Sequence, residues 1–197
     1  MDMTLDDIKR RKMLQTAATA VGGIAAISVA IPFIESMQPS EAAKAAGAPV
    51  EVDIGTIRPG QLLTVAWRGK PVWILHRTDA MLASLDQHDA LLADPLSKQV
   101  QQPAAAANPS RALRPPFLVL VGICTHLGCV PSFRPEPGGA ELGPQWPGGF
   151  YCPCHGSRFD LAGRVFKNVP APLNLVVPEY SYLGDSRLVI GAAPPKA

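Results

Sequence analysis

The side chains of this chain that can bind metal are concentrated in two short segments. All four cysteines, and two of the four histidines, lie in residues 124–129 (CTHLGC) and 152–157 (CPCHGS). The first segment contains a Cys-x-His pair and the second a Cys-x-x-His pair. Two thiolates and two imidazoles on separate loops suit a two-iron cluster in which one iron takes the sulfur ligands and the other takes the nitrogen ligands.

Other uses of these residues are open at this point. A zinc ion can also be held by two cysteines and two histidines, but zinc would leave the second cysteine of each segment without a role. Four cysteines that are free or only disulfide-bonded leave the two histidines at ligand spacing unexplained. Colour and EPR distinguish a metal-stabilised binding module from a redox protein. The other two histidines, His76 and His88, lie outside both segments and are expected to have core or surface roles.

The sequence resembles the Rieske iron-sulfur protein of the proteobacterial ubiquinol-cytochrome c reductase, from the basic N-terminus to the last expected strand. The resemblance implies one Rieske-type 2Fe-2S cluster whose two irons are held by Cys124 with Cys152, and by His126 with His155. It also implies a disulfide between Cys129 and Cys154 that ties the two loops together. Soluble Rieske ferredoxins of dioxygenase systems lack this second cysteine pair, so the pair argues against them. Because disulfides persist outside the cytosol, the domain is expected in an oxidising compartment.

The resemblance also implies roles around the cluster. His155 is placed against the quinol hydroxyl, with His126 also near the exposed tip. Ser157 matches a serine that donates a hydrogen bond to a cluster sulfur. Three further residues match the family's docking surface and the proline loop that covers the cluster, and these are Leu127, Gly128 and Pro170. Two departures from the family pattern are visible: residues 167–172 read KNVPAP instead of KGPAP, and Phe159 replaces a common tyrosine.

Histidine ligation changes the chemistry that a 2Fe-2S cluster can perform. Neutral imidazoles in place of two thiolates reduce the negative charge around iron, which raises the reduction potential into a range of about −150 to +300 mV. An iron-bound imidazole is a stronger acid than a free one, so its remaining ring proton can leave near physiological pH when the cluster is oxidised. After reduction the proton is held more tightly. An oxidised cluster can therefore accept an electron and a proton together from a quinol.

The N-terminal residues have the composition of a membrane span. Residues 13–34 contain no charged side chain and are rich in alanine, isoleucine and valine. As a helix they reach about 33 Å, which is enough to cross a bilayer. Four basic residues stand directly before them, at Lys9, Arg10, Arg11 and Lys12. The positive-inside rule then places residues 1–12 in the cytoplasm and the domain on the far side of the membrane. The resemblance implies that this is a bacterial inner membrane, crossed once, with the domain in the periplasm.

The pair Arg10-Arg11 before a weakly apolar stretch also resembles a twin-arginine export signal, which carries folded cargo. A cluster assembled in the cytosol needs such a route. The alternative is that the basic residues act only as a topological anchor. Residues 43–45 (AKA) offer a small-x-small cleavage pattern far beyond the apolar stretch. The resemblance implies instead that the segment stays in place as an anchor.

Residues 35–48, rich in alanine, are expected to form a flexible hinge between the span and the domain. Fourteen residues cover about 21 Å as a helix and up to about 50 Å when extended, so a change between the two would move the domain by tens of ångströms. An inert spacer would have the same composition. The resemblance favours a hinge that lets the cluster domain move between the quinol and cytochrome c sites.

Residues 49–197 are expected to form the Rieske 2Fe-2S domain, with its cluster-binding loops within residues 124–172. The expected fold class is an all-β Rieske domain of antiparallel sheets with a cluster-binding subdomain, plus one N-terminal transmembrane helix. The 21 prolines and 17 glycines agree with a loop-rich β domain. Short apolar runs predict strands at residues 62–67, 72–76, 117–123, 164–167, 173–177 and 187–190. A helical insertion is expected over residues 78–96, and irregular loops over residues 99–116 and 131–149.

The predicted function is that of the Rieske iron-sulfur subunit of a quinol-cytochrome c reductase, an electron carrier that is catalytic only within its complex. The resemblance implies that such a subunit takes an electron and a proton from quinol and passes the electron to the cytochrome c subunit, in electron transfer coupled to proton translocation. The expected partners are the cytochrome b and cytochrome c subunits of a dimeric complex, ubiquinol and the lipid bilayer. The alternative is the Rieske small subunit of another exported oxidoreductase such as arsenite oxidase, which would be accompanied by a molybdenum subunit. No nucleic acid is expected, because the net charge is only +2 and no basic stripe is interleaved with aromatics.

Overall fold

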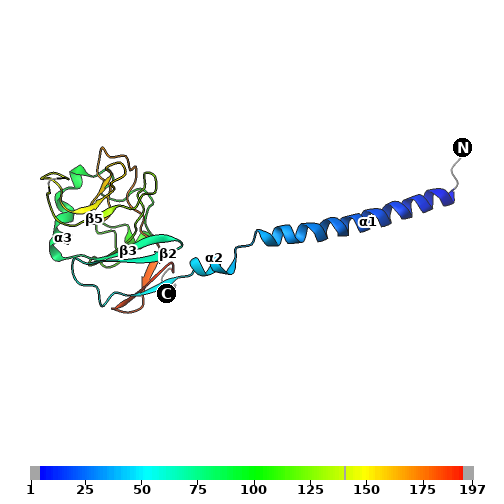
Figure 1. Ribbon diagram of the computed structural model, residues 1–197, viewed down its shortest axis with the longest axis horizontal. Coiled ribbons are helices and arrows are strands. Elements are labelled where there is room, and N and C mark those ends of the chain that lie inside the picture. Colours follow the sequence, from blue (N-terminus) through cyan, green and yellow to red (C-terminus); the bar gives the residue numbers. More distant parts are fainter. Residues whose placement is uncertain (1–4, 140, 193–197) are drawn as a thin grey trace. The chain divides into compact units, whose positions relative to one another are not determined.

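The computed structural model describes residues 5–139 and 141–192. The chain divides into two compact units, Met1–Ala45 and Ala46–Ala197. Within the described residues the first unit is helical, and the second is built from short strands and the loops between them (Figure 1). The apolar N-terminal stretch and the two cysteine-containing segments therefore belong to different units.

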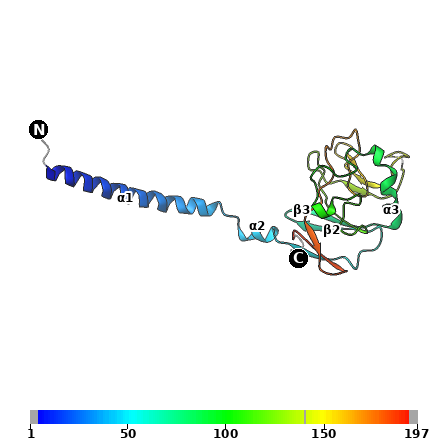
Figure 2. The ribbon, with the colours of Figure 1, turned by 180° about the vertical axis from the view of Figure 1, so that it is seen from behind.

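A single helix, α1 (Leu5–Ser36), makes up most of the first unit and runs without a break (Figures 1 and 2). It contains all of residues 13–34 and also the basic residues ahead of them, so the expected span is part of a longer helix. No residue of α1 is buried, and its most apolar 18-residue window has a mean hydropathy of 2.0. By length and composition this helix can cross a membrane.

Hydroxyl groups in the apolar part of α1 are satisfied within the helix. Those of Thr16, Thr19 and Ser28 each donate to the carbonyl oxygen four residues earlier, at 3.0, 2.9 and 2.9 Å. Such bonds remove the cost of leaving a donor unpaired in hydrocarbon. These three hydroxyl-bearing residues are therefore compatible with a bilayer.

A short helix, α2 (Glu41–Ala46), occupies part of the expected hinge. The Ser40 hydroxyl accepts a hydrogen bond from the Ala43 N–H at 3.2 Å, and the Lys44 ammonium pairs with the Glu41 carboxylate at 2.7 Å. Six residues are too few for a stable isolated helix in water, and an exposed ion pair adds little. This helix is therefore a segment that can unwind at low cost.

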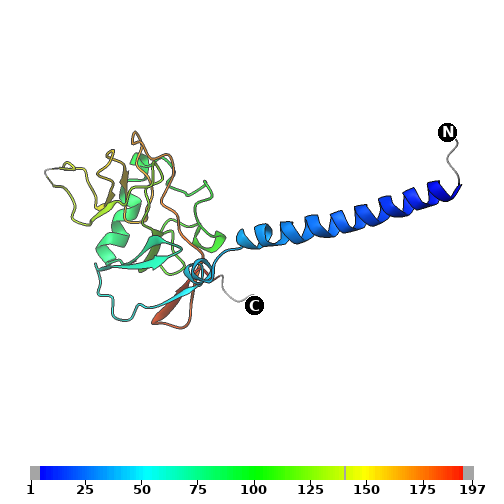
Figure 3. The same ribbon diagram turned by 45° about the vertical axis from the view of Figure 1, so that its right-hand side comes forward.

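The second unit contains, among its described residues, three antiparallel sheets of three strands each. Their strand orders are β1-β9-β8, β2-β3-β4 and β5-β6-β7. The strands are β1 (Val50–Asp53), β2 (Leu62–Trp67), β3 (Lys70–His76), β4 (Phe117–Val121), β5 (Ser132–Arg134), β6 (Gly149–Tyr151), β7 (Arg158–Phe159), β8 (Tyr180–Tyr182) and β9 (Arg187–Ile190). The pair β8 and β9 and the segment with β5 lie at opposite ends of the domain, with β2 and β3 between them (Figures 1 and 3). The expected all-β fold of antiparallel sheets is confirmed.

Both cysteine-containing segments are attached to the small sheet of β5, β6 and β7. Residues 124–129 lie between β4 and β5, and residues 152–157 connect β6 to β7. A side chain at Gly149 would collide with the Phe159 carbonyl, so glycine is required where β6 and β7 approach. Phe150 of β6 stacks on Trp73 of β3 with ring centres 4.9 Å apart, which fixes the small sheet against the β2-β3-β4 sheet.

The expected helical insertion over residues 78–96 is only partly helical. The helical pieces here and farther along are α3 (Asp79–Ser84) and the 3-10 turns η1 (Leu85–Gln87), η2 (Asp89–Leu91) and η3 (Ala104–Ala106). The breaks place the Leu85 carbonyl and the Asp89 carboxylate against the Arg164 guanidinium. In a regular helix the Leu85 carbonyl would accept a bond from its own helix. Pairing with Arg164 therefore explains why the helix ends early.

Two predicted strands, at residues 164–167 and 173–177, are irregular in the structure. Residues 164–167 form only isolated bridges to other segments. In residues 173–177, the backbone of three successive residues bonds to three separate segments, at Gly163, Val121 and Gln101. A strand needs successive bonds to one neighbour. The apolar runs at these positions reflect burial under loops, and the strand prediction was wrong for both.

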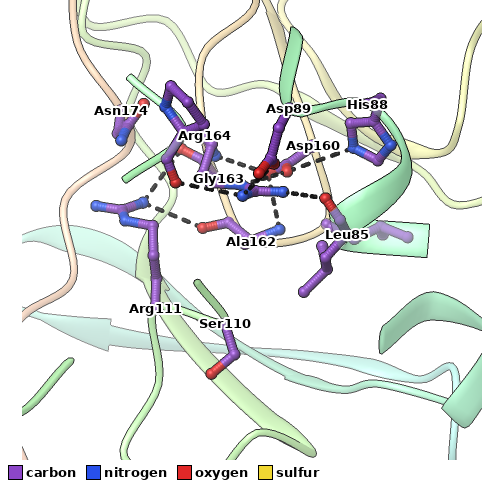
Figure 4. Close-up of polar contacts among 12 residues, drawn as sticks. Leu85, His88, Asp89, Ser110, Arg111, Asp160, Ala162, Gly163, Arg164 and Asn174 are labelled. Carbon is purple, nitrogen blue, oxygen red and sulfur yellow. Dashed lines mark hydrogen bonds and ion pairs between the residues drawn. The ribbon is translucent and has the colours of Figure 1, made fainter. Parts of the chain in front are cut away.

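A buried ion pair lies directly after the second cysteine-containing segment (Figure 4). Asp160 and Arg164 are both fully buried, and Arg164 Nε donates to Asp160 Oδ2 at 2.7 Å. The other carboxylate oxygen accepts from the N–H groups of Ala162 and Arg164, at 2.9 and 2.7 Å. The Arg164 guanidinium also bonds to Asp89 at 2.8 Å. Each carboxylate oxygen of Asp160 is thus satisfied, as burial of an ion pair requires.

The charge of Asp160 depends on these neighbours. Burial by itself would raise the pKa of this carboxyl, but the His88 imidazole and the Arg164 guanidinium outweigh burial and lower the pKa below its ordinary value. Arg164 is the stronger partner, because His88 Nε2 is 3.5 Å from the carboxylate, which is long for a hydrogen bond. A carboxyl with a lowered pKa stabilises the fold above its unfolded pKa of about 3.9, and this contribution is lost as pH falls through the folded value.

We predict that Asp160→Asn lowers the free energy of unfolding near neutral pH by about 3 to 5 kcal/mol, because the buried Arg164 charge loses its partner. It should also flatten the acid limb, so that the parent loses stability below about pH 4 more steeply than the variant. Thermal unfolding of the full chain, followed by circular dichroism across this pH range, measures both effects. The control is Asp185→Asn, which changes a fully exposed carboxylate. If Asp160→Asn and Asp185→Asn changed the unfolding free energy and its pH dependence to the same extent, the role given to Asp160 would be contradicted.

Candidate metal centre

The first cysteine-containing segment is a closed turn. The N–H of Cys124 donates to the carbonyl of Cys129 at 2.7 Å, and the N–H of Gly128 donates to the carbonyl of Cys124 at 3.1 Å. Gly128 has a φ of 83°, which glycine adopts without strain. The turn buries Cys124, half-buries His126 and leaves Leu127 71% exposed. Its sulfur donor is therefore inside the domain, and its imidazole is at the surface.

The second cysteine-containing segment repeats the same turn. The N–H of Cys152 donates to the carbonyl of Ser157 at 2.8 Å, and the N–H of Gly156 donates to the carbonyl of Cys152 at 2.9 Å. Gly156 also has a positive φ, of 76°. Cys152 is buried and His155 is exposed. Both turns have glycine four residues after their first cysteine, and this shared spacing is a sequence signal for the turn.

The two turns are joined by a disulfide between Cys129 and Cys154, as the resemblance implied. The two residues are 25 apart in sequence, and closing a loop of that size contributes about 3 to 4 kcal/mol on the chain-entropy model. Cys124 and Cys152 are free and buried. The four cysteines are thus divided into one covalent pair and one pair of thiols.

The four expected ligands come together as two pairs. The thiols of Cys124 and Cys152 lie within hydrogen-bond distance of each other. Burial raises the pKa of the Cys152 thiol; the hydrogen bond from the Cys154 backbone N–H lowers this pKa, and the Cys124 thiol raises it further. The rings of His126 and His155 lie 4.8 Å apart between centres and are nearly perpendicular. The donor set is therefore a buried sulfur pair and a nitrogen pair at the surface.

This division fits a two-iron cluster better than a zinc ion. A Rieske cluster has its sulfur and nitrogen ligands on different irons, so the four donors need not surround one point. Zinc requires all of its donors around one ion. Among the described residues, three donors close enough for a single ion are found only at Cys129, Cys152 and Cys154. Two of these are bonded to each other and cannot act as thiolates, so the zinc alternative is not supported.

A third segment, residues 170–173, is hydrogen-bonded to both turns and, after the role that the resemblance implies, is called the covering segment below. The fully buried Ser157 hydroxyl accepts from the Ala171 N–H at 3.0 Å. The Thr125 hydroxyl donates to the Leu173 carbonyl at 2.6 Å. Each turn is thus bonded to the covering segment. Thr125 was not singled out from the sequence, although its place inside the first turn was an available signal.

The departure from the family pattern ahead of Pro170 is accommodated by one residue. Asn168 has a φ of 56°, in the left-handed region that asparagine adopts more readily than most residues. The chain can therefore turn here without the glycine that the family commonly has. Pro170 is exposed and Ala171 is buried, so the covering segment presents one residue outward and packs the next inward.

The chain matches two protein families. Residues 50–181 match the family described as "Rieske [2Fe-2S] domain", which covers well over half of the chain. Residues 1–40 match the family described as "Ubiquitinol-cytochrome C reductase Fe-S subunit TAT signal". The two matches correspond to the two kinds of sequence that composition separates, an apolar N-terminal stretch and a domain with two cysteine-containing turns.

Three curated relatives align with nearly the whole chain, and each is named "Ubiquinol-cytochrome c reductase iron-sulfur subunit". The protein from Allochromatium vinosum is 57% identical over 92% of this chain and 88% of its own length. The protein from Blastochloris viridis is 43% identical over 93% of both chains. The protein from Rhodospirillum rubrum is 41% identical over 92% of this chain and 91% of its own length.

We predict that replacing a cysteine expected to ligate iron and replacing a cysteine of the disulfide have different effects on the cluster and on stability. Cys124→Ser should abolish the EPR signal of the reduced cluster, because Cys124 is an expected thiolate ligand of one iron. Cys129→Ser should leave a cluster signal in a less stable domain, since only the link worth about 3 to 4 kcal/mol is lost. EPR together with thermal unfolding of the full chain measures both. A normal spectrum from Cys124→Ser would overturn the ligand assignment, and unchanged stability of Cys129→Ser would overturn the role of the disulfide.

Proposed function

This chain belongs to the Rieske family as a ubiquinol-cytochrome c reductase iron-sulfur subunit, and we propose that it takes one electron and one proton from ubiquinol and passes the electron to the cytochrome c subunit. It is a subunit of an oxidoreductase complex with one Rieske-type 2Fe-2S cluster, and it is associated with cytochrome b and c subunits. The three relatives all bear the reductase name. The alternative of an arsenite oxidase subunit is therefore not favoured.

We propose that Cys124 and Cys152 ligate one iron and that His126 and His155 ligate the other. The burial of the thiol pair and the surface position of the imidazole pair support this division. When bound, the cluster supplies a one-electron acceptor whose potential is raised by neutral imidazole ligands. The Ser157 hydroxyl uses its oxygen to accept from a backbone N–H, so its own hydrogen is available to donate to a cluster sulfur.

The observation that carries the proposal is the exposure of His155 beside an apolar surface. An imidazole that ligates through one ring nitrogen keeps the other for a proton. Because His155 is exposed, that second nitrogen can accept a hydrogen bond and then the proton from a quinol hydroxyl, with His126 alongside it. Three exposed residues offer an apolar docking surface around this contact, and these are Leu127, Gly128 and Pro170. Docking there would exclude water from the proton transfer.

We further propose that α1 anchors the chain in a bacterial inner membrane, with residues 1–12 in the cytoplasm and the domain in the periplasm. The basic residues ahead of the apolar stretch support this orientation. A disulfide suits an oxidising compartment, and the match of residues 1–40 to an export-signal family supports delivery of a folded domain. The complex is proposed to be dimeric and embedded in lipid, with residues 35–48 as the hinge that lets the domain move.

We predict that a quinol-site inhibitor shifts the EPR signal of the reduced cluster in the purified membrane complex. Leu127→Asn should keep the cluster, weaken that shift and lower quinol oxidation by about tenfold to a hundredfold, because burial of a leucine side chain is worth about 1.5 to 3 kcal/mol. The matched control is Leu183→Asn, because Leu183 is 48% exposed and follows β8. If the inhibitor abolishes quinol oxidation but leaves the EPR signal of the reduced cluster unchanged, the placement of quinol at the cluster tip would be overturned.

A further inference from the structure

Three buried arginines surround the backbone that follows the second turn. Arg77, Arg111 and Arg164 are all 2% exposed or less. Arg77 donates to the Leu161 carbonyl at 3.1 Å. Arg111 Nη1 donates to the carbonyls of the next two residues, at 3.1 and 3.2 Å, and Arg164 holds Asp160 (Figure 4). This stretch is therefore bonded to guanidinium groups along its whole length.

Arg111 differs from the other two in the segments that it connects. While Nη1 bonds to the carbonyls of Ala162 and Gly163, Nη2 donates to the Leu175 carbonyl at 2.7 Å and to the Gln102 side chain at 3.1 Å. Gly163 lies on the chain that leaves the second turn, and Leu175 lies on the chain that leaves the covering segment. A planar guanidinium holds its donors in a fixed arrangement, so Arg111 bridges these two chains with defined geometry.

The chain that leads into the first turn reaches the same point. Gly163 has a φ of 70°, and a Cβ there would lie 2.9 Å from Leu120 Cδ1 and 3.2 Å from Arg111 Nη1. Leu120 belongs to β4, which precedes Cys124. The N–H of Leu175 donates to the Gly163 carbonyl at 2.8 Å. The three chains that carry the two turns and the covering segment therefore meet at Arg111 and Gly163.

Arg111 occupies this position at a cost. It is fully buried, burial lowers the pKa of its guanidinium to about 10, and its acceptors among the described residues are carbonyl and amide oxygens rather than a carboxylate. Its backbone has a φ of 49°, which is unfavourable for a residue other than glycine. A buried charge and a left-handed backbone both cost free energy. The hydrogen bonds that Arg111 makes between the converging chains have to compensate for this free-energy cost.

We propose that Arg111 is a positioning residue for the metal centre: it fixes the covering segment onto the two turns and thereby sets the surroundings of the cluster sulfurs and imidazoles. This inference takes the ligation proposed above as its premise. The connection from Arg111 is short, since Leu175 is two residues from Leu173, which accepts from Thr125. Ala171, in the same segment, donates to Ser157.

The test compares Arg111→Lys with Arg114→Lys in the full chain within its complex. Lysine keeps the charge but cannot reproduce the planar set of donors, whereas Arg114 lies on the same loop with a half-exposed side chain bonded to Asp185. We expect Arg111→Lys to retain iron and to broaden or split the EPR signal of the reduced cluster. We also expect the amide hydrogens of residues 171 and 173–175 to exchange about tenfold faster than in the parent. Tenfold corresponds to about 1.4 kcal/mol, near the lower limit for a hydrogen bond to a charged group. Arg114→Lys should match the parent.

A second variant keeps the inference testable if Arg111→Lys fails to fold. Gln102→Ala removes one acceptor from the Arg111 guanidinium without disturbing its charge, and it should give the same changes at smaller size. A parental EPR signal and parental amide exchange in a folded Arg111→Lys or Gln102→Ala protein would overturn the positioning role. That result would leave the proposed function intact, because the inhibitor-induced shift of the parental complex is measured separately.

Discussion

The metal centre depends on two backbone hydrogen bonds that close each cysteine-containing turn. In both turns the N–H of the first cysteine bonds to the carbonyl of the sixth residue, and the N–H of the glycine bonds back to the cysteine. These bonds involve no side chain, so the path of each turn is fixed by backbone. The disulfide then joins the turns, and Ser157 and Thr125 attach the covering segment. The positions of the expected ligands follow from this frame.

Buried arginines in this domain donate hydrogen bonds to buried backbone carbonyl groups, a role that neighbouring strands fill in a regular sheet. The strands are short, and much of the buried backbone lies in loops whose carbonyl groups have no neighbouring strand. A buried carbonyl without a partner is costly. Each guanidinium has five donors and can satisfy several carbonyls at once. Arg77 and Arg111 together serve carbonyls in the chains before β4 and after β7, and in this way they replace part of a hydrogen-bond ladder.

The sequence predicted the parts of the fold that rest on local patterns. The apolar stretch before residue 35, the strand from Leu62, the strand leading to Cys124 and the repeated Cys and His spacing are all readable without tertiary information. The strands predicted at residues 164–167 and 173–177 were wrong, because a buried apolar run looks the same whether its backbone bonds to one neighbour or to three. The helix after Thr78 was predicted too long, since its end depends on Arg164, which is far along the chain. The importance of Arg111 could not be predicted, because an isolated arginine in a proline-rich loop is normally a solvated residue.

The two turns have the same backbone but carry different residues at equivalent places, and this breaks what would otherwise be a symmetric site. The third position is His126 in one turn and Cys154 in the other, whereas the fourth is Leu127 in one and His155 in the other. The fourth position is exposed in both turns, but the third is only half-exposed where it is histidine. The histidine is therefore shifted by one position between two turns with the same hydrogen-bond pattern. As a result the two imidazoles differ in solvent exposure, and His155 is the more accessible of the two.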